Sequence, residues 1–150
     1  MHDLVVIALT SPILIGVYKD KELIETIQSS EHSSEVLAGI FKSLLQRYEI
    51  EHIIYANGPG SFMAIKVSFI FLRTLCIVKK ISLLATDAFY FNNNAPIKAV
   101  GKLYFVKNTN AIETVPFLEA PLMEFRLPQQ LKLEDFSSES APFYGIGAVG

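Results

Sequence analysis

The chain contains a single cysteine, a small charge imbalance and no obvious leader segment. Because Cys76 stands alone, no disulfide framework can form within the chain, and its position in a long apolar segment predicts a buried, reduced thiol. A formal net charge of −2 provides no basic footprint for binding nucleic acid without a partner. Asp3 and the brevity of the first apolar run argue against a signal peptide, so we expect a cytoplasmic protein.

Catalytic and metal-binding patterns are equally scarce. No cysteine, aspartate or second histidine stands at ligand spacing from His32, which favours a loop contact, and His52 is expected to pack at the start of a strand. Ser61 lacks the surroundings of a nucleophile elbow. The sequence therefore predicts no catalytic residue, no metal site and no cofactor, and favours a protein that is not an enzyme.

What the chain has is enough apolar material for a core, with 51% hydrophobic residues among 150. Alternating and helical patterns predict a β-β-β-α-β-α-β order, in which the helices pack on a mixed sheet. The expected strands cover residues 4–9, 12–18, 23–28, 52–56 and 81–85, and the expected helices cover residues 34–48 and 62–78.

A smaller, β-rich half is expected to begin near residue 96, after an asparagine-rich loop. The pattern divides the chain into an N-terminal lobe over residues 1–95 and a shortened C-terminal lobe over residues 96–150. The expected elements of the second lobe are strands at 97–106, 111–117, 122–127 and 143–150 and one short helix within 128–136.

A glycine-proline-glycine turn joins the strand at 52–56 to the second helix. Gly58 and Gly60 permit a backbone path closed to larger residues, and Ser61 is well placed to cap the helix. Free N–H groups at such a turn can also bind an anion, so Gly58, Gly60 and Ser61 form a candidate nucleotide or anion site. The glycine spacing matches neither a P-loop nor a dinucleotide fingerprint, which favours a structural turn.

The second helix is unusually apolar. Among residues 62–78, 13 of 17 are apolar, and the only charges, Lys66 and Arg73, fall on one stripe. Two charges and a length below about 20 residues argue against a membrane span. Two explanations stay open, a subunit interface and a helix enclosed within the chain's own core. Burying one large apolar side chain contributes about 1.5–3 kcal/mol, so a bare second face could sustain association.

Two segments carry a resemblance to a known family. Residues 58–66 read Gly-Pro-Gly-Ser-Phe-Met-Ala-Ile-Lys, and residues 31–33 read Glu-His-Ser. They resemble the TsaB (YeaZ) family, whose turn usually reads Gly-Pro-Gly-Ser-Phe-Thr-Gly-Ile/Val-Arg and whose first helix follows Glu-His-Ser/Thr. The resemblance covers residues 1–106 and, more loosely through Tyr-Gly-Ile-Gly at 144–147, the remainder. It implies an α/β, ribonuclease H-like (actin-like ATPase) lobe, related to the sugar kinases, with a truncated second β-rich lobe.

The resemblance also implies a function. TsaB-like proteins are non-catalytic scaffold subunits in the threonylcarbamoyladenosine modification of tRNA, where they bind a TsaD-like catalytic subunit in a complex with a TsaE-like ATPase. Contact with tRNA is expected only through that complex. The family contact is made by the two helices, which here implies a set of partner-facing or helix-supporting residues: Leu37, Phe41, Leu44, Phe62, Ala64, Ile65, Ser68, Phe71, Leu72 and Leu75.

The chain also departs from the family. Where relatives carry Asp-Thr-Ala/Ser-Thr at the end of the first strand, residues 7–10 read Ile-Ala-Leu-Thr, so the carboxylate that would organise a metal ion near phosphate is missing. Ile70, Leu72 and Thr74 stand where glycine or alanine is frequent, which predicts a differently shaped partner surface. Two alternatives stay open, a homodimeric pseudoenzyme and a small nucleotide-binding protein of the same fold.

Overall fold

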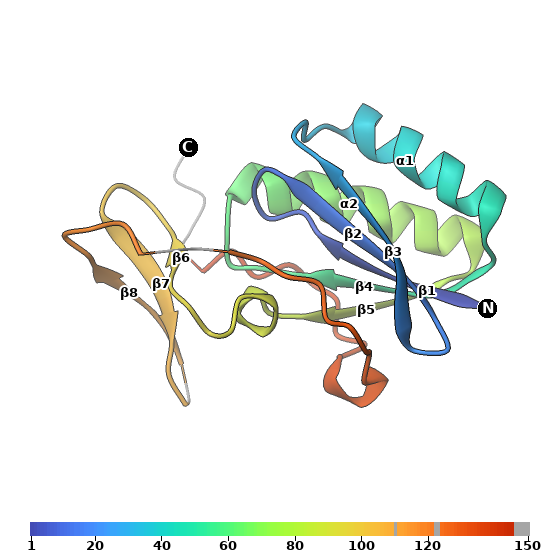
Figure 1. The fold of residues 1–150 in the computed structure, drawn as a ribbon. Coiled ribbons are helices and arrows are strands. Elements are labelled where there is room, and N and C mark those ends of the chain that lie inside the picture. The colour runs from blue at the N-terminus through green and yellow to red at the C-terminus, as the bar shows by residue number, and fades with distance from the viewer. Residues whose placement is uncertain (110, 122–123, 146–150) are drawn as a thin grey trace.

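A computed structural model describes residues 1–109, 111–121 and 124–145. Its N-terminal part is a mixed five-stranded sheet with two helices on one face (Figure 1). The predicted β-β-β-α-β-α-β order is confirmed, with small differences at the ends of the elements. They are β1 (His2–Ile7), β2 (Ile13–Lys19), β3 (Glu22–Ser29), α1 (Ser34–Arg47), β4 (Ile50–Ala56), α2 (Phe62–Lys79) and β5 (Ser82–Thr86).

The strand order is β3-β2-β1-β4-β5, with antiparallel pairing among the first three strands and parallel pairing of β1 with β4 and of β4 with β5. The central strand β1 is buried on both faces. Leu4 and Val6 belong to the core beneath the helices, while Val5 and Ile7 belong to the core on the opposite face. This alternation is what the two-residue period of a strand requires.

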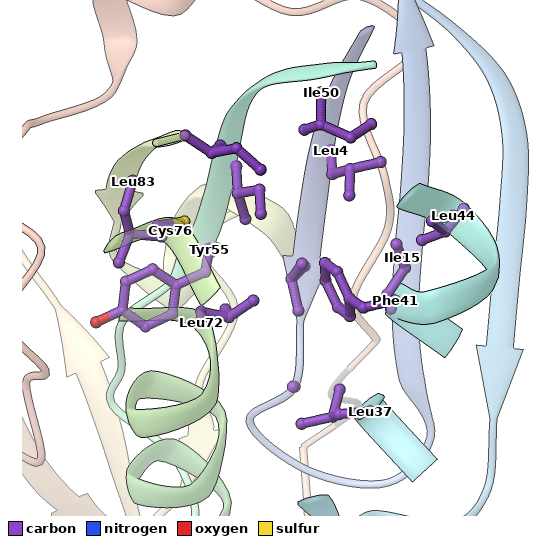
Figure 2. Packing of buried hydrophobic residues seen from close by; sticks show 14 of the residues in the cluster. Leu4, Ile15, Leu37, Phe41, Leu44, Ile50, Tyr55, Leu72, Cys76 and Leu83 are labelled. Carbon is purple, nitrogen blue, oxygen red and sulfur yellow. The ribbon is translucent and has the colours of Figure 1, made fainter. Parts of the chain in front are cut away.

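Both helices bury one side against the sheet and run in the same direction. Each connects to a following strand that is parallel to β1, so each helix must return antiparallel to the sheet's parallel strands. Figure 2 shows the helix residues that pack in the core beneath the helices, with Cys76 beside Leu83 of β5; they are Leu37, Phe41 and Leu44 of α1 and Leu72 and Cys76 of α2. Their burial anchors the helical layer.

The second half of the chain covers the other face of the sheet. The 3-10 helix η1 (Ala88–Phe91) and the buried side chains of Leu131 and Phe136 pack there. A separate three-stranded sheet lies beside them, in the order β6-β7-β8, and a further 3-10 turn, η2, precedes the C-terminal segment. Their bounds are β6 (Ile97–Lys98), β7 (Leu103–Lys107), β8 (Ile112–Pro116) and η2 (Leu133–Asp135).

Several predicted elements of this half are wrong in extent. The single strand expected over 97–106 is a hairpin, because the chain turns at Gly101, whose φ is 59°. Residues 124–127 form no strand, since the backbone N–H of Arg126 donates to the carbonyl of Phe91 at 2.8 Å instead of to a neighbouring strand. Of the last expected strand, residues 143–145 are not in a strand, and 146–150 lie outside the described residues.

The helix expected over residues 128–136 is also wrong, apart from the three residues of η2. Two backbone groups in this stretch bind the β2–β3 hairpin: Gln129 accepts from the N–H of Leu23, and the N–H of Leu131 donates to Lys21, at 2.9 and 2.8 Å. The Tyr18 hydroxyl donates to the carbonyl of Pro128 at 2.5 Å. These tertiary bonds hold the chain extended, so a helical ladder cannot form here.

Candidate partner-binding surface

The turn before α2 is held by bonds within the chain. The Ser61 hydroxyl accepts from the N–H of Ala64 at 3.4 Å, which confirms the predicted cap, and the N–H of Ser61 donates to the carbonyl of Leu9 at 3.1 Å. A Cβ atom on Gly60 would lie only 2.9 Å from the Cβ of Leu9. The end of β1 and the start of α2 are therefore locked together, which fixes the direction of the helix.

Beyond this turn, α2 presents a large apolar stripe to solvent. Its inner side is buried, whereas the exposed fractions of the outward residues are high: Met63 62%, Ile70 53%, Ile77 64% and Val78 67%. Met63, Ile70 and Ile77 recur every seven residues and so share one side of the helix. The alternative that the chain itself encloses this helix is wrong, since one apolar side is left uncovered by the described residues. None of the described helices is long and apolar enough to cross a membrane.

A groove runs along the junction of α1 and α2. It consists of one hollow of about 500 Å³, between Ser34 of α1 and the outer side of α2, and another of about 430 Å³ farther along the two helices. Phe71 and Leu75 line both hollows, so they form the floor shared by the two. We call the groove together with the outward residues Met63, Ile70, Ile77 and Val78 the helical face.

The residues predicted to support or face a partner divide into two groups. Six are buried within the chain and hold the helices on the sheet, so they are not available for direct contact: Leu37, Phe41, Leu44, Ile65, Ser68 and Leu72. Ser68 satisfies its hydroxyl inside α2 by donating to the carbonyl of Ala64 at 2.8 Å. Four are partly exposed, and their contact with a partner stays a prediction: Phe62, Ala64, Phe71 and Leu75.

The sequence reasoning missed the most exposed apolar residues of α2, Met63, Ile77 and Val78, and used Ile70 only as a departure from the family. No amphipathic signal separates the two sides of α2, because apolar residues occupy both. The side that meets the sheet is set by tertiary packing, which places Leu72 and Cys76 in the core beneath the helices (Figure 2). In the sequence, the charged residues Lys66 and Arg73 indicated one edge of α2 that faces solvent.

Cys76 confirms the prediction of a buried, reduced thiol. It is 4% exposed and carries no disulfide. Burial raises the pKa of its thiol to about 11, and nearby Arg73 offsets only part of that rise. The thiol therefore packs as an apolar group beneath the helical face.

The candidate anion site at Gly58, Gly60 and Ser61 has few free donors. The N–H of Ser61 is bound to Leu9, and Gly58 is buried beneath the C-terminal segment, where the carbonyl oxygen of Phe143 occupies the place of a Cβ atom. A hollow of about 170 Å³ remains between Gly60, Ser61 and the start of the second sheet. Anion binding here stays a prediction.

The end of β1 carries no carboxylate. Ile7, Ala8 and Leu9 are buried and apolar, and the carbonyl of Ala8 is bound by the Nε2 atom of His32 at 2.8 Å, the loop contact expected of that histidine. The arrangement offers no acidic ligand where the superfamily resemblance would place one. Thr10 is the nearest polar side chain along the chain.

Asp3 lies at the other end of β1, where its carboxylate contacts His52 and Lys21. Its Oδ1 atom is 2.8 Å from Nδ1 of His52, and its Oδ2 atom is 3.3 Å from Nζ of Lys21. Asp3, Glu51 and His52 are close enough to ligate one ion. The lysine that already neutralises Asp3 instead indicates an ion-pair cluster, which ties the start of β4 to β1 as expected for His52.

The strand order and the helical layer define the class of fold: a mixed α/β lobe with a ribonuclease H-like (actin-like ATPase) fold and an uncovered helical surface. Comparison with solved structures gives the particular form, a YeaZ (TsaB)-like fold. YeaZ from Pseudomonas aeruginosa matches with a TM-score of 0.61 and 14% sequence identity, over 85% of this chain and 69% of that chain.

A second solved structure agrees. It is an uncharacterized protein with similarity to peptidase YeaZ from Pseudomonas aeruginosa, which matches with a TM-score of 0.56 and 14% identity, over 85% of this chain and 68% of that chain. No protein-family model matches the chain, and no curated protein does. At this level of identity the likeness establishes the fold, and it confirms the fold class expected from the sequence.

Proposed function

We propose that the chain is a TsaB-like, non-catalytic scaffold subunit of the machinery that makes threonylcarbamoyladenosine in tRNA. It binds a TsaD-like catalytic subunit through the helical face, and a TsaE-like ATPase and tRNA join only in the complex. The observation that carries the proposal is the uncovered apolar stripe of α2, on a helical layer whose other side is fully packed. The YeaZ-like fold supports the choice of partner.

The strength of the apolar stripe is consistent with a stable contact. Met63, Ile70, Ile77 and Val78 are each more than half exposed, so covering them would contribute roughly 1–2 kcal/mol per residue. Together the four residues would contribute about 4–8 kcal/mol, against an association cost of about 4–15 kcal/mol in lost freedom. Covering the groove floor at Phe71 and Leu75 as well would increase that contribution. A partner helix lying in the groove would cover both.

The assignment of a non-catalytic role rests on the end of β1. Buried Ile7 stands where a metal-organising carboxylate is expected from the superfamily resemblance. Without that carboxylate, phosphate chemistry would have no acidic metal ligand at this position. Catalysis would then belong to the partner.

Light scattering on a size-exclusion column tests the proposal. The chain is run alone and then mixed with the TsaD-like protein of the same organism. A stable heteromer is the expected result. A homodimer that ignores the TsaD-like protein would contradict the proposal and favour a homodimeric pseudoenzyme, and a monomer in both runs would contradict any role of the helical face in association.

Matched substitutions locate the contact. Ile70→Glu should abolish the heteromer while preserving the far-ultraviolet circular-dichroism spectrum, because the side chain is 53% exposed. Ile24→Glu, at a 50% exposed isoleucine of the edge strand β3, changes the same residue type and charge away from the helical face and should leave the heteromer intact. Equal loss in both variants would contradict the location.

The nucleotide-binding alternative is tested by melting. A ligand that binds only the folded state raises the melting temperature. With the N–H of Ser61 bound to Leu9 and no carboxylate at the end of β1, we expect no shift with millimolar ATP or ADP and magnesium. A shift that disappears in Ser61→Ala would instead favour the nucleotide-binding protein.

A further inference from the structure

Charge is segregated between the helical layer and the rest of the chain. Residues 34–47 and 62–80 contain one acidic residue, Glu35, and six basic residues: Lys42, Arg47, Lys66, Arg73, Lys79 and Lys80. Their formal charge is +5. Since the whole chain carries −2, the remaining residues carry −7. A protein that is mildly acidic overall therefore presents a basic helical layer.

Most of these cations are free to meet a partner. Arg47 is the exception, because both of its terminal nitrogens lie 2.9 Å from the carboxylate of Glu25. Within residues 1–109, 111–121 and 124–145, no ion pair involves the other five, Lys42, Lys66, Arg73, Lys79 and Lys80, and all five are exposed. Unpaired ammonium and guanidinium groups that surround an apolar surface attract carboxylates.

The basic groups lie at the edges of the apolar surface. On α2, Lys66 follows Met63 by three residues and Arg73 follows Ile70 by three, so each cation lies about one helical turn from an exposed apolar side chain. Lys42 and Lys79 line the second hollow of the groove. The helical face thus has an apolar centre and a basic rim, which resembles the usual anatomy of an interface core and its polar surroundings. A partner that binds this face must therefore cover the apolar centre and place acidic groups opposite the basic rim.

We propose that the helical face selects a protein surface in which apolar side chains are flanked by carboxylates, and that it disfavours a second copy of this chain. The inference rests on the proposed function in taking the helical face as the contact surface. In a two-fold dimer the same surface meets itself, so the free cations of one copy would approach those of the other. Like charges brought together at an interface cost several kcal/mol.

Nucleic acid is a poorer occupant of this surface. A phosphate backbone would satisfy the rim, but it would leave the stripe of Met63, Ile70, Ile77 and Val78 without an apolar partner. Binding of tRNA to the chain alone, in competition with the TsaD-like subunit, would overturn the proposal.

Salt dependence provides the first measurement. The dissociation constant for the TsaD-like subunit is measured by fluorescence anisotropy in about 0.05 M and about 0.5 M sodium chloride, where the Debye length falls from roughly 14 to 4 Å. We expect binding at least about tenfold weaker at the higher salt concentration. Binding that is unchanged or tighter at high salt would overturn the inference and leave the proposed function standing.

Charge reversal provides the second measurement. Lys66→Glu with Arg73→Glu should weaken binding at low salt by at least about tenfold, since it places carboxylates against the partner's carboxylates. The control is Lys102→Glu with Lys132→Glu, which changes the net charge equally at exposed positions outside the helices and should leave binding unchanged. Equal effects of the two pairs would show that net charge, not the rim, is responsible, and would overturn the inference.

A third measurement does not depend on the TsaD-like subunit. Two synthetic amphipathic helices carry the same leucine face, flanked by glutamates in one and by lysines in the other. The glutamate-flanked peptide should bind the chain at least about tenfold more tightly, and Ile70→Glu should remove that binding. Equal binding of both peptides would overturn the inference. If only the TsaD-like subunit fails to bind, the proposed function is lost while the stated chemistry of the face is supported.

Discussion

The rings of Phe41 and Phe71 lie 5.4 Å apart, tilted by 57°, where α1 and α2 meet. Phe41 is 1% exposed and belongs to the core, whereas Phe71 packs on that core and also forms the floor of the groove. Phe71 therefore serves stability and surface shape together. Ile70, its neighbour in sequence, points outward and serves the surface alone.

This difference predicts that alanine substitutions at the two adjacent positions change the free energy of unfolding by different amounts. Phe71→Ala should lower the free energy of unfolding by about 2 kcal/mol, less than the 3–5 kcal/mol of a fully buried phenylalanine because one side of the ring is already exposed. Ile70→Ala should change it by less than about 0.5 kcal/mol. Urea unfolding at neutral pH measures both. A large loss in Ile70→Ala would show that this side of α2 is packed after all.

Three glycines provide a second prediction, because the same substitution should have opposite effects. At Gly58 the φ is +129° and a Cβ atom would overlap the carbonyl of Phe143, so Gly58→Ala should cost more than about 2 kcal/mol. Gly60→Ala would press on Leu9 and should destabilise as well.

Gly39 is the matched control for these substitutions. It lies within α1 with no atom within 4 Å of a Cβ position, so Gly39→Ala should stabilise the protein by about 0.5–1 kcal/mol. Differential scanning calorimetry of the three variants would separate the two effects. A destabilised Gly39→Ala would mean that α1 has a close neighbour on its outer side.

Much of the N-terminal lobe could be predicted because its signals are local. Short apolar runs define β1 and β2, and an alternating pattern defines β3. Ser61 caps α2 through a bond between residues three apart. The C-terminal segment could not be predicted in the same way. Gln129 and Leu131 are held extended by backbone bonds to the β2–β3 hairpin, more than a hundred residues earlier in the chain, and no local pattern reports such a partner.

The candidate surface shows the same limit. That α2 has an excess apolar side follows from composition, since residues 62–78 contain too few polar residues for a single buried stripe. Which side is buried does not follow, because Leu72 and Ile70 are equally apolar and only packing on the sheet distinguishes them. The sequence therefore predicts that a surface exists and leaves its residues to the structure.

Cys76 gives a direct measure of how tightly the helical layer is packed. Because burial raises the pKa of its thiol to about 11, only about one thiol in a thousand is ionised at pH 8, and the side chain is 4% exposed. Ellman's reagent should react with the native protein many times more slowly than with the protein in urea, and Cys76→Ser should not react. A fast native reaction would contradict a closed core beneath α2.

The contact between Glu25 of β3 and the end of α1 predicts a dependence of stability on pH. Both terminal nitrogens of Arg47 lie 2.9 Å from the carboxylate oxygens of Glu25, and the Tyr48 hydroxyl donates to the same carboxylate at 2.7 Å. The bonds from Arg47, followed by the bond from Tyr48, hold the pKa of Glu25 below its ordinary value of 4.5. A carboxyl group whose pKa is lowered by folding stabilises the folded state at pH values above its unfolded pKa.

That stabilisation should be lost as the pH falls from about 4.5 through the lower pKa of the folded state. Glu25→Gln should therefore unfold at a lower urea concentration than the wild type at pH 7, and the two should converge once the pH falls below the folded-state pKa of Glu25. The difference at pH 7 should be smaller than that of Phe71→Ala, because the groups are at the surface. In an Arg47→Gln background the same substitution should matter less, since the main partner is gone. A difference that persists unchanged at the lower pH would mean that Glu25 stabilises the strand through packing and not through its charge.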